Sequence, residues 1–291
     1  MNNIRLYLLF GALGSLIIIP CAALGGFYGA LAGLTLAVIA IVYFYMRSDV
    51  GIMKKLGARK VTDTSSWTLT LVEEISRKAR LGHAPQVYVI PTKAPNACVV
   101  GRNANRAQLG LTEGLLETLT KRELEGVVGH ELAHIRQCDS KLGGIVSSVV
   151  DALMRLTSEG RRLSYTATSR FVGEPERRSG ALRSFASLLV TPVAAAFVQL
   201  SITRNREFLA DRHGATFTNR FQELASALLK IQRSSERMDS DNFPHLAHLF
   251  IYSSFRRPFL SALFSSHPPV SERVAQLEKL ASTGGGVEGV Y

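Results

Sequence analysis

Two histidines four residues apart are the strongest candidates for chemistry in this chain. They stand in the stretch His130-Glu131-Leu132-Ala133-His134. On a helix, side chains at positions i and i+4 share one face, so both imidazoles can reach one ion. Neutral imidazole suits Zn²⁺, and Glu131 can take a proton from the water that such an ion activates. The alternative is an exposed helix face with two incidental histidines.

The residues around this motif predict that it lies on a helix. Thr120 and Glu123 have the spacing of a capping box, which marks a helix start. Beyond the cap, apolar residues recur at the intervals of a buried helical stripe: Leu124, Val127, Val128, Leu132 and Ile135. A cap followed by one apolar stripe favours a structured helix over an incidental pair of histidines.

A third ligand is expected on a second stretch of the chain. Residues 203–212 read as a helix, on which Glu207 and Asp211 lie four apart on one face. Glu207 can complete a set of two histidines and one carboxylate with an open position, which is a catalytic zinc arrangement. Asp211 can accept the free ring N–H of a ligating histidine, and His130 is the expected one. Without the histidine helix, the same two residues would read as an exposed acidic pair balanced by Arg204, Arg206 and Arg212.

An apolar N-terminal region must position this chemistry at a membrane. Between Arg5 and Arg47 the chain has no charged residue and no histidine across 41 positions. Gly25 and Gly26 divide this run into two lengths of about 20 residues, and each is long enough to cross a bilayer. We therefore predict a transmembrane helical hairpin. A cleaved signal peptide ending near Cys21 is the alternative, but its apolar region would be only about 7–15 residues long.

The charge distribution predicts the orientation of this hairpin. Basic residues follow the second apolar length closely: Arg47, Lys54, Lys55, Arg59 and Lys60. By the positive-inside rule, the more basic side is cytoplasmic. Since two crossings return the chain to its starting side, both the N-terminus and the residues after 47 are expected in the cytoplasm.

Composition excludes several classes of protein. With 46% apolar and 20% charged residues, the chain is too hydrophobic to be disordered. The net charge of +11 does not indicate nucleic-acid binding, because basic residues are dispersed or lie beside apolar segments and no such motif is present. Anionic lipid is the expected partner of the juxtamembrane cations. Three widely separated cysteines imply no disulfide framework and fit a reducing compartment.

Two weaker apolar segments leave the topology open. Segment 142–156 contains Asp151 and Arg155, and segment 185–202 is uncharged but only 18 residues long. They either span the membrane or associate with it. Because His134 and Glu207 must meet one ion, the chain between them crosses the membrane an even number of times.

The chain resembles the HtpX-like membrane zinc metalloproteases, relatives of the CAAX prenyl proteases and of Oma-type mitochondrial proteases. The resemblance covers nearly the whole length. Besides the hairpin, it rests on Pro95-Asn96-Ala97-Cys98, Leu111-Thr112-Glu113-Gly114-Leu115-Leu116, His130-Glu131-Leu132-Ala133-His134 with Asp139, Arg206-Glu207-Phe208-x-Ala210-Asp211, and His267-Pro268-Pro269 with Arg273. At Cys98 the family usually has Phe. The resemblance implies a gluzincin fold, one zinc ion and endoproteolysis facing the cytoplasm of a bacterial inner membrane, in stress-related quality control of membrane proteins.

The resemblance also implies a cleft for an extended substrate. Short strands are expected over 86–92, 97–102 and 106–112. In such proteases an edge strand holds the substrate by main-chain hydrogen bonds. Asn96, Ala97 and Val99 are candidates to line that cleft, with an ordinary turn as the alternative.

His267 is the candidate for a further catalytic role. It precedes two prolines, which hold its backbone extended. By resemblance it approaches the zinc and stabilises the oxyanion; the alternative is a histidine in a surface loop. Asp139 is expected to be a local cap or a contact of a ligand, and not itself a ligand.

Together these features predict an α+β, mostly helical protein that hydrolyses peptide bonds of membrane proteins, with Glu131 activating a zinc-bound water. The expected parts are a hairpin, a first protease part, a membrane-associated insert, a second protease part and a tail: 1–46, 47–141, 142–203, 204–283 and 284–291. A catalytically silent membrane chaperone or scaffold on the same fold is the alternative function. No nucleic acid is expected as a partner.

Overall fold

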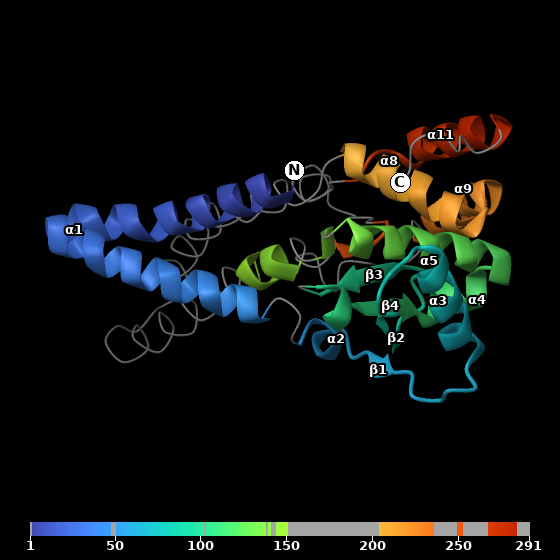
Figure 1. Cartoon of the computed structure of the whole chain (residues 1–291), viewed down its shortest axis with the longest axis horizontal. Coiled ribbons are helices and arrows are strands. Elements are labelled where there is room, and N and C mark those ends of the chain that lie inside the picture. Colours follow the sequence, from blue (N-terminus) through green and yellow to red (C-terminus); the bar gives the residue numbers. More distant parts are fainter. Residues whose placement is uncertain are drawn as a thin grey trace, which may run out of the picture.

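The computed structural model describes residues 2–47, 51–101, 103–137, 139–140, 144–150, 204–235, 249–252 and 267–283. Within them, a long helical hairpin projects from a body in which helices pack around a small sheet (Figure 1). This is the mostly helical α+β fold that the sequence predicts. Of the predicted insert 142–203 only 144–150 are described, as helix, and the predicted tail 284–291 lies outside the described residues.

Helix α1 (Asn2–Arg47) forms the hairpin. It folds back at Gly25 and Gly26, which have non-helical backbone angles, and Gly26 has a φ of 56°, a value that glycine adopts without steric cost. The stretch Tyr7–Met46 has a mean hydropathy of 2.2 and is long and apolar enough to cross a membrane. Each arm of about 20 residues spans about 30 Å, which matches the hydrocarbon core of a bilayer.

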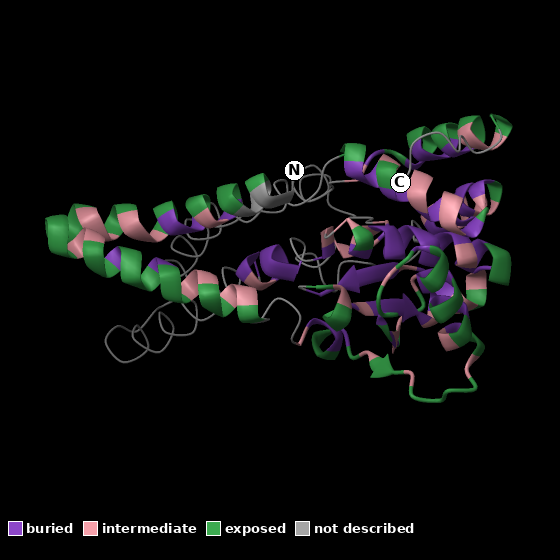
Figure 2. Ribbon diagram, in the orientation of Figure 1, coloured by how far each residue is buried: buried purple, intermediate pink, exposed green. Residues whose placement is uncertain are grey.

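Much of α1 is exposed (Figure 2). Of the exposed large hydrophobic side chains in the described part of the chain, all but Trp67 and Leu209 belong to α1. A core helix of a soluble protein would bury these side chains. A contiguous apolar surface of this kind marks contact with lipid or with another apolar surface.

The sheet has four strands in the order β1-β2-β4-β3: β1 (Arg59–Lys60), β2 (Gln86–Ile90), β4 (Gln108–Thr112) and β3 (Ala97–Val100). β2 and β4 are parallel, whereas β1 with β2 and β3 with β4 are antiparallel. The three strands expected from the sequence are present with shorter bounds. β3 is therefore the last strand at one edge of the sheet.

Helix α5 (Lys121–Arg136) lies at the centre of the body. It packs against β3 and α3 (Trp67–Lys78), and it also contacts α8 (Arg204–Thr218) and α9 (Phe221–Ser235) (Figure 1). Its capping box is present as predicted, with Thr120 and Glu123 bonding each other's backbone N–H groups. The remaining elements are α2 (Ile52–Lys55), the 3₁₀ turn η1 (Ala104–Arg106), α4 (Glu113–Thr118) and α11 (Val270–Ser282), which packs against α8 and α9.

Candidate metal centre

Helix α5 presents the two histidines of the motif to one point. His130 and Glu131 are buried, at 0% and 2% exposure, and His134 is partly buried. The Nε2 atoms of His130 and His134 lie 3.2 Å apart. The helical spacing thus brings both imidazoles together, as the sequence predicts.

Two glycines bring α8 against this face of α5. A Cβ atom on Gly214 would lie 2.4 Å from the backbone N of His130, and one on Gly129 would lie 2.6 Å from the carbonyl oxygen of Gly214. The two backbones therefore touch where the helices cross, an approach that side chains at these positions would block. This close crossing places Glu207 and Asp211 of α8 beside the histidines.

Glu207 supplies the third donor. Its Oε1 lies 3.5 Å from His134 Nε2, and its Oε2 lies 4.0 Å from His130 Nε2. His130, His134 and Glu207 each offer one possible ligand atom, and these three atoms all lie within 4.8 Å of one another. Ligands bound at about 2.0–2.1 Å around a tetrahedral zinc ion are about 3.3 Å apart, so the donor set fits such an ion. The alternative of an exposed acidic pair is wrong, because Glu207 and Asp211 are 1% and 3% exposed.

Each imidazole is oriented by a carboxylate on its other nitrogen. His130 Nδ1 lies 2.8 Å from Asp211 Oδ1, and His134 Nδ1 lies 3.3 Å from Asp139 Oδ2. Asp139 in turn pairs with Arg206. An Nδ1–H that donates to a carboxylate leaves the Nε2 lone pair free for a metal. Asp139 thus contacts His134, a candidate metal ligand, and contact with a ligand is one of the two roles expected for Asp139.

Arg273 holds this arrangement together, a role that the motif pattern did not predict. Its guanidinium is 1% exposed and donates to both oxygens of Asp211, from Nε at 2.7 Å and from Nη2 at 2.6 Å. Its Nη1 lies 3.8 Å from Glu207 Oε2. To predict this role, the sequence would have to show that an arginine is buried beside two acidic residues of a neighbouring helix. Arginine is mostly exposed in folded proteins, so the burial of this one could not be predicted.

The structure also brings His267 into the centre. Its Nδ1 lies 2.7 Å from Glu207 Oε2, and its Nε2 is buried without a hydrogen-bond partner. His267 is therefore no surface-loop histidine. The buried and unpaired Nε2 is a polar atom available to a ligand in the centre.

The candidate cleft residues lie at and beside β3. Ala97 and Val99 are buried in the main core. Asn96 is half-buried, and its Nδ2 donates to the carbonyl of Tyr252 at 2.6 Å. The carbonyl of Ala97 accepts from the backbone N–H of Ile251 at 3.0 Å. The segment 249–252 thus lies along β3, and nothing in the sequence pattern pointed to it.

The comparisons with known proteins agree with this geometry. The model of peptidase family M48 matches residues 63–281. The chain belongs to this family. A Protease HtpX homolog of Methanocaldococcus jannaschii is 36% identical over 282 residues, covering 95% of this chain and 96% of that protein. Protease HtpX of Legionella pneumophila (strain Lens) is 32% identical over 285 residues, covering 96% and 99%.

Among solved structures, the crystal structure of S. mikatae Ste24p is similar to this chain. The TM-score is 0.48 at 17% sequence identity, and the match covers 93% of this chain and 63% of that chain. The M48 assignment makes this chain a metalloprotease, and with the apolar hairpin it supports a membrane metalloprotease.

Burial sets the protonation of the M48 centre. It lowers the pKa of His130 to about 4, against the opposing hydrogen bond to Asp211, so this ring is neutral at pH 7. It raises the pKa of Glu131 to about 7, despite the nearby His134. Burial alone would also raise the pKa of Glu207, but the charge and hydrogen bond of His267 hold it well below its usual range. A neutral imidazole beside an ionised carboxylate is what a metal cation requires.

His134 behaves differently from His130. Burial by itself lowers its pKa, but the hydrogen bond to Asp139 and the charge of Glu207 outweigh burial and raise the pKa to about 9. The raised pKa favours a second proton on this ring at pH 7. A metal ion must displace that proton when it binds.

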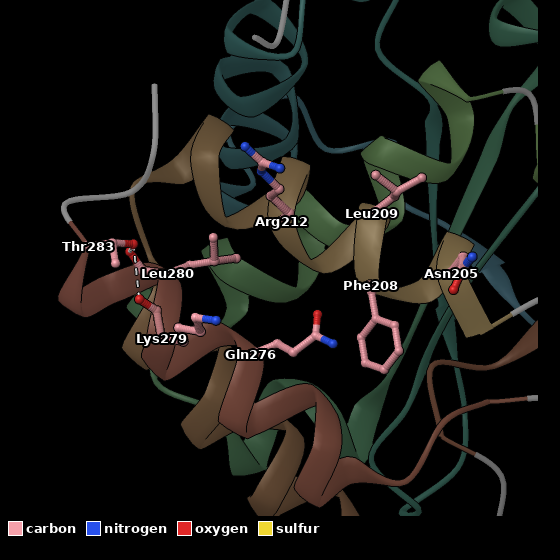
Figure 3. Close-up of a pocket in the computed structure, with 8 residues that line it drawn as sticks. All are labelled: Asn205, Phe208, Leu209, Arg212, Gln276, Lys279, Leu280 and Thr283. Carbon is pink, nitrogen blue, oxygen red and sulfur yellow. Dashed lines mark hydrogen bonds between the residues drawn. The ribbon is translucent and has the colours of Figure 1, made fainter. Parts of the chain in front are cut away.

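A hollow of about 640 Å³ lies beside α8 and is not the catalytic cleft of the M48 domain (Figure 3). Its lining comes from α8 and α11: Asn205, Phe208, Leu209, Arg212, Gln276, Lys279, Leu280 and Thr283. None of the metal-site residues contributes to it.

Proposed function

We propose that this chain is a membrane-bound, zinc-dependent endopeptidase that cleaves misfolded or damaged membrane proteins. The observation that carries this is the convergence of two Nε2 atoms and one Glu207 carboxylate on one point, with the buried carboxyl of Glu131 on the adjacent helical position. Two imidazoles with one carboxylate and an open position favour zinc over the harder cations, which prefer oxygen ligands alone.

Glu131 moves the proton in this function. When bound, the zinc ion supplies a Lewis acid that polarises the scissile carbonyl and lowers the pKa of water. Glu131 takes the proton of the attacking water and later delivers it to the leaving amine. A general acid–base residue works best when its pKa is near the working pH, and burial raises the pKa of Glu131 to about 7.

His267 is proposed to stabilise the oxyanion of the tetrahedral intermediate. Its Nδ1 is held by Glu207, which fixes the ring and leaves Nε2 to face the reaction. A ring nitrogen that carries a proton can donate a hydrogen bond to the oxyanion.

The hairpin supports the proposed substrate class and location. A protease body joined to an apolar hairpin acts within reach of the bilayer, so membrane proteins are the proposed substrates and lipid the surrounding partner. We propose a bacterial inner membrane with the active site on the cytoplasmic side, and an even number of crossings by 142–156 and 185–202, which lie largely outside the described residues. None of the observations above favours the alternative function, a catalytically silent membrane chaperone or scaffold.

The test compares Glu131→Gln with Glu207→Ala in the detergent-solubilised full chain. Glu131→Gln is expected to keep zinc and to lose at least about 10³-fold in the rate of casein cleavage, because the proton acceptor is gone. Glu207→Ala is expected to lose bound zinc as well as cleavage. Metal analysis and gel-based proteolysis measure the two effects.

The unaltered chain serves as the control. Its cleavage should stop with a chelator and return with added zinc, which a scaffold would not do. Turnover retained by purified Glu131→Gln would contradict the assignment of Glu131. Full metal occupancy in Glu207→Ala would remove Glu207 from the ligand set.

A further inference from the structure

Strand β3 offers its outer edge as a surface for an extended peptide. On one side it pairs with β4, and no further named strand follows it in the sheet. The carbonyl of Ala97 points away from β4, since it accepts from Ile251, and strand alternation directs the backbone groups of Val99 the same way. The edge of a sheet can bind an extended chain through main-chain hydrogen bonds.

The chain's own segment 249–252 already occupies this edge. Cys98 and Phe250 form an antiparallel bridge, next to the hydrogen bond from Ile251 N to Ala97 O. The side chain of Asn96 contacts Tyr252 twice: Nδ2 donates to its carbonyl at 2.6 Å, and Oδ1 accepts from its N–H at 3.3 Å. The bond from Ile251 N to Ala97 O joins main chain to main chain, as a bond from an added peptide strand would, whereas the two bonds of Asn96 come from its side chain.

The segment lies between the edge and the metal centre. While the N–H of Ile251 bonds β3, its carbonyl accepts from Arg273 Nη1 at 3.1 Å. The same guanidinium binds Asp211, which orients His130. A substrate held against β3 close to the metal ligands would therefore need the space that Ile251 fills.

Side-chain packing fixes the segment to both cores. Ile251 is 2% exposed and belongs to the main core, whereas Phe250 packs against a second cluster that contains Met53, Cys98 and Val100. The neighbouring residues follow the same division, since Leu249 also packs against the second cluster and Tyr252 against the main core. The segment is thus held at β3 by the bridge between Cys98 and Phe250 and by packing against both clusters.

We propose that segment 249–252 is a built-in occupant of the peptide-binding edge and that a substrate backbone replaces it on β3 before cleavage. This inference rests on the proposed function, because β3 holds substrate only if the chain is an endopeptidase. Each bond that the segment gives up is remade by the incoming strand, so the exchange depends on an extended and unpaired peptide. Folded proteins, whose backbone bonds are satisfied internally, would not compete.

The native Cys98 allows a direct test. Since Ala97 and Ile251 are hydrogen-bonded partners, Cys98 and Phe250 form the neighbouring non-hydrogen-bonded pair, whose Cα atoms lie about 4.5 Å apart. This separation is within the range of a disulfide, about 4.4–6.8 Å. The variant Phe250→Cys, oxidised with diamide, should therefore lock the segment onto β3.

The full chain locked by the disulfide is expected to cleave casein at least about tenfold more slowly than the same variant after reduction. The disulfide prevents segment 249–252 from leaving β3, so no molecules remain in which a substrate can take its place. Mass spectrometry confirms the disulfide, and metal analysis confirms that zinc is kept. The double variant Cys98→Ser/Phe250→Cys controls for other thiols and should show no redox dependence. Equal cleavage by the locked and the reduced forms would overturn the proposal.

A binding readout separates this proposal from the proposed function. Fluorescence anisotropy of a labelled, unstructured peptide is measured with the Glu131→Gln/Phe250→Cys chain, and only the reduced form is expected to bind. A chain without protease activity fails the cleavage assay in both redox states but is still tested by this binding. If the locked form binds the peptide equally well, the segment does not occupy the peptide edge.

The variant Phe250→Ala tests the same exchange without a crosslink. Removing the ring weakens the packing of the segment, so the KM for the peptide is expected to fall several-fold while the zinc content stays constant. An unchanged or higher KM would contradict the proposed exchange.

Discussion

At the scale of single residues, Arg273 shows how a side chain outside the ligand set can determine metal binding. It lies on α11, and its two hydrogen bonds to Asp211 reach across to α8. One of these bonds goes from Arg273 Nη2 to Asp211 Oδ1, and the same oxygen atom lies 2.8 Å from His130 Nδ1. A planar guanidinium can hold both carboxylate oxygens in one orientation, whereas a lysine ammonium can hold only one.

Arg273→Lys is therefore expected to weaken zinc binding about 10–100-fold, the usual effect of losing a partner of a metal ligand. Competition with a chromogenic chelator measures the affinity. Arg220→Lys is the matched control, because Arg220 binds Glu125 through Nε at 2.7 Å and touches none of the metal ligands. An affinity equal to that of the unaltered chain would mean that Arg273 does not position Asp211.

At the scale of elements, the crossing of α5 and α8 decides whether a centre exists at all. The histidines belong to one helix and Glu207 to the other, and Gly129 and Gly214 let the backbones touch. Any side chain at the crossing would separate the helices. Because ligand bonds tolerate only a few tenths of an ångström, the site is more sensitive to this crossing than the fold is.

Gly214→Ala should lower the free energy of unfolding by about 1–3 kcal/mol, the usual effect of overpacking, and should weaken zinc binding more than tenfold. Chemical denaturation and chelator competition measure the two effects. Gly82→Ala is the control, since a Cβ there meets no atom within 4 Å. Zinc affinity unchanged in Gly214→Ala would show that the helices can move apart without moving Glu207.

At the scale of the whole molecule, a partly buried network joins α5 to α9. Glu123 of α5 accepts from Ser226 and from Lys230 of α9, at 2.7 Å and 2.8 Å. Burial alone would raise the pKa of Glu123, but the hydrogen bonds from Lys230, Ser226 and Thr120 outweigh burial and lower the pKa to about 2. Ionised Glu123 thus takes part both in the cap of α5 and in the contact between α5 and α9.

The body is therefore expected to lose stability in acid. A carboxyl with a folded-state pKa near 2 and an ordinary value of 4.5 stabilises the fold fully above pH 4.5. This contribution falls as the pH drops from about 4.5 to about 2, by at most about 1.4 kcal/mol per pH unit. Urea unfolding at several pH values measures the slope. Glu123→Gln should make the unfolding free energy change less with pH between about pH 4.5 and pH 2. An equally steep change would mean that other groups cause the acid sensitivity.

The sequence alone determined the features that depend on neighbouring residues. Helical spacing placed His130 and His134 on one face, the cap at Thr120 started their helix, and Gly25-Gly26 divided the apolar run where the hairpin turns. These follow from backbone geometry, capping and turn preferences, which act over a few residues. Strands β2, β3 and β4 were predictable for the same reason, and only their ends differ.

Tertiary structure decided which distant groups meet. The helix crossing brought Glu207 to the histidines, the docking of α11 delivered Arg273, and the pairing of segment 249–252 covered the outer edge of β3. The meeting of Glu207 with the histidines was predicted from the types of donor they supply, but the roles of Arg273 and of segment 249–252 were not. Each of these contacts joins residues more than 60 positions apart through the packing of complete elements, so local sequence does not set its geometry. Local propensities determine which elements form, whereas shape complementarity between them determines the active centre.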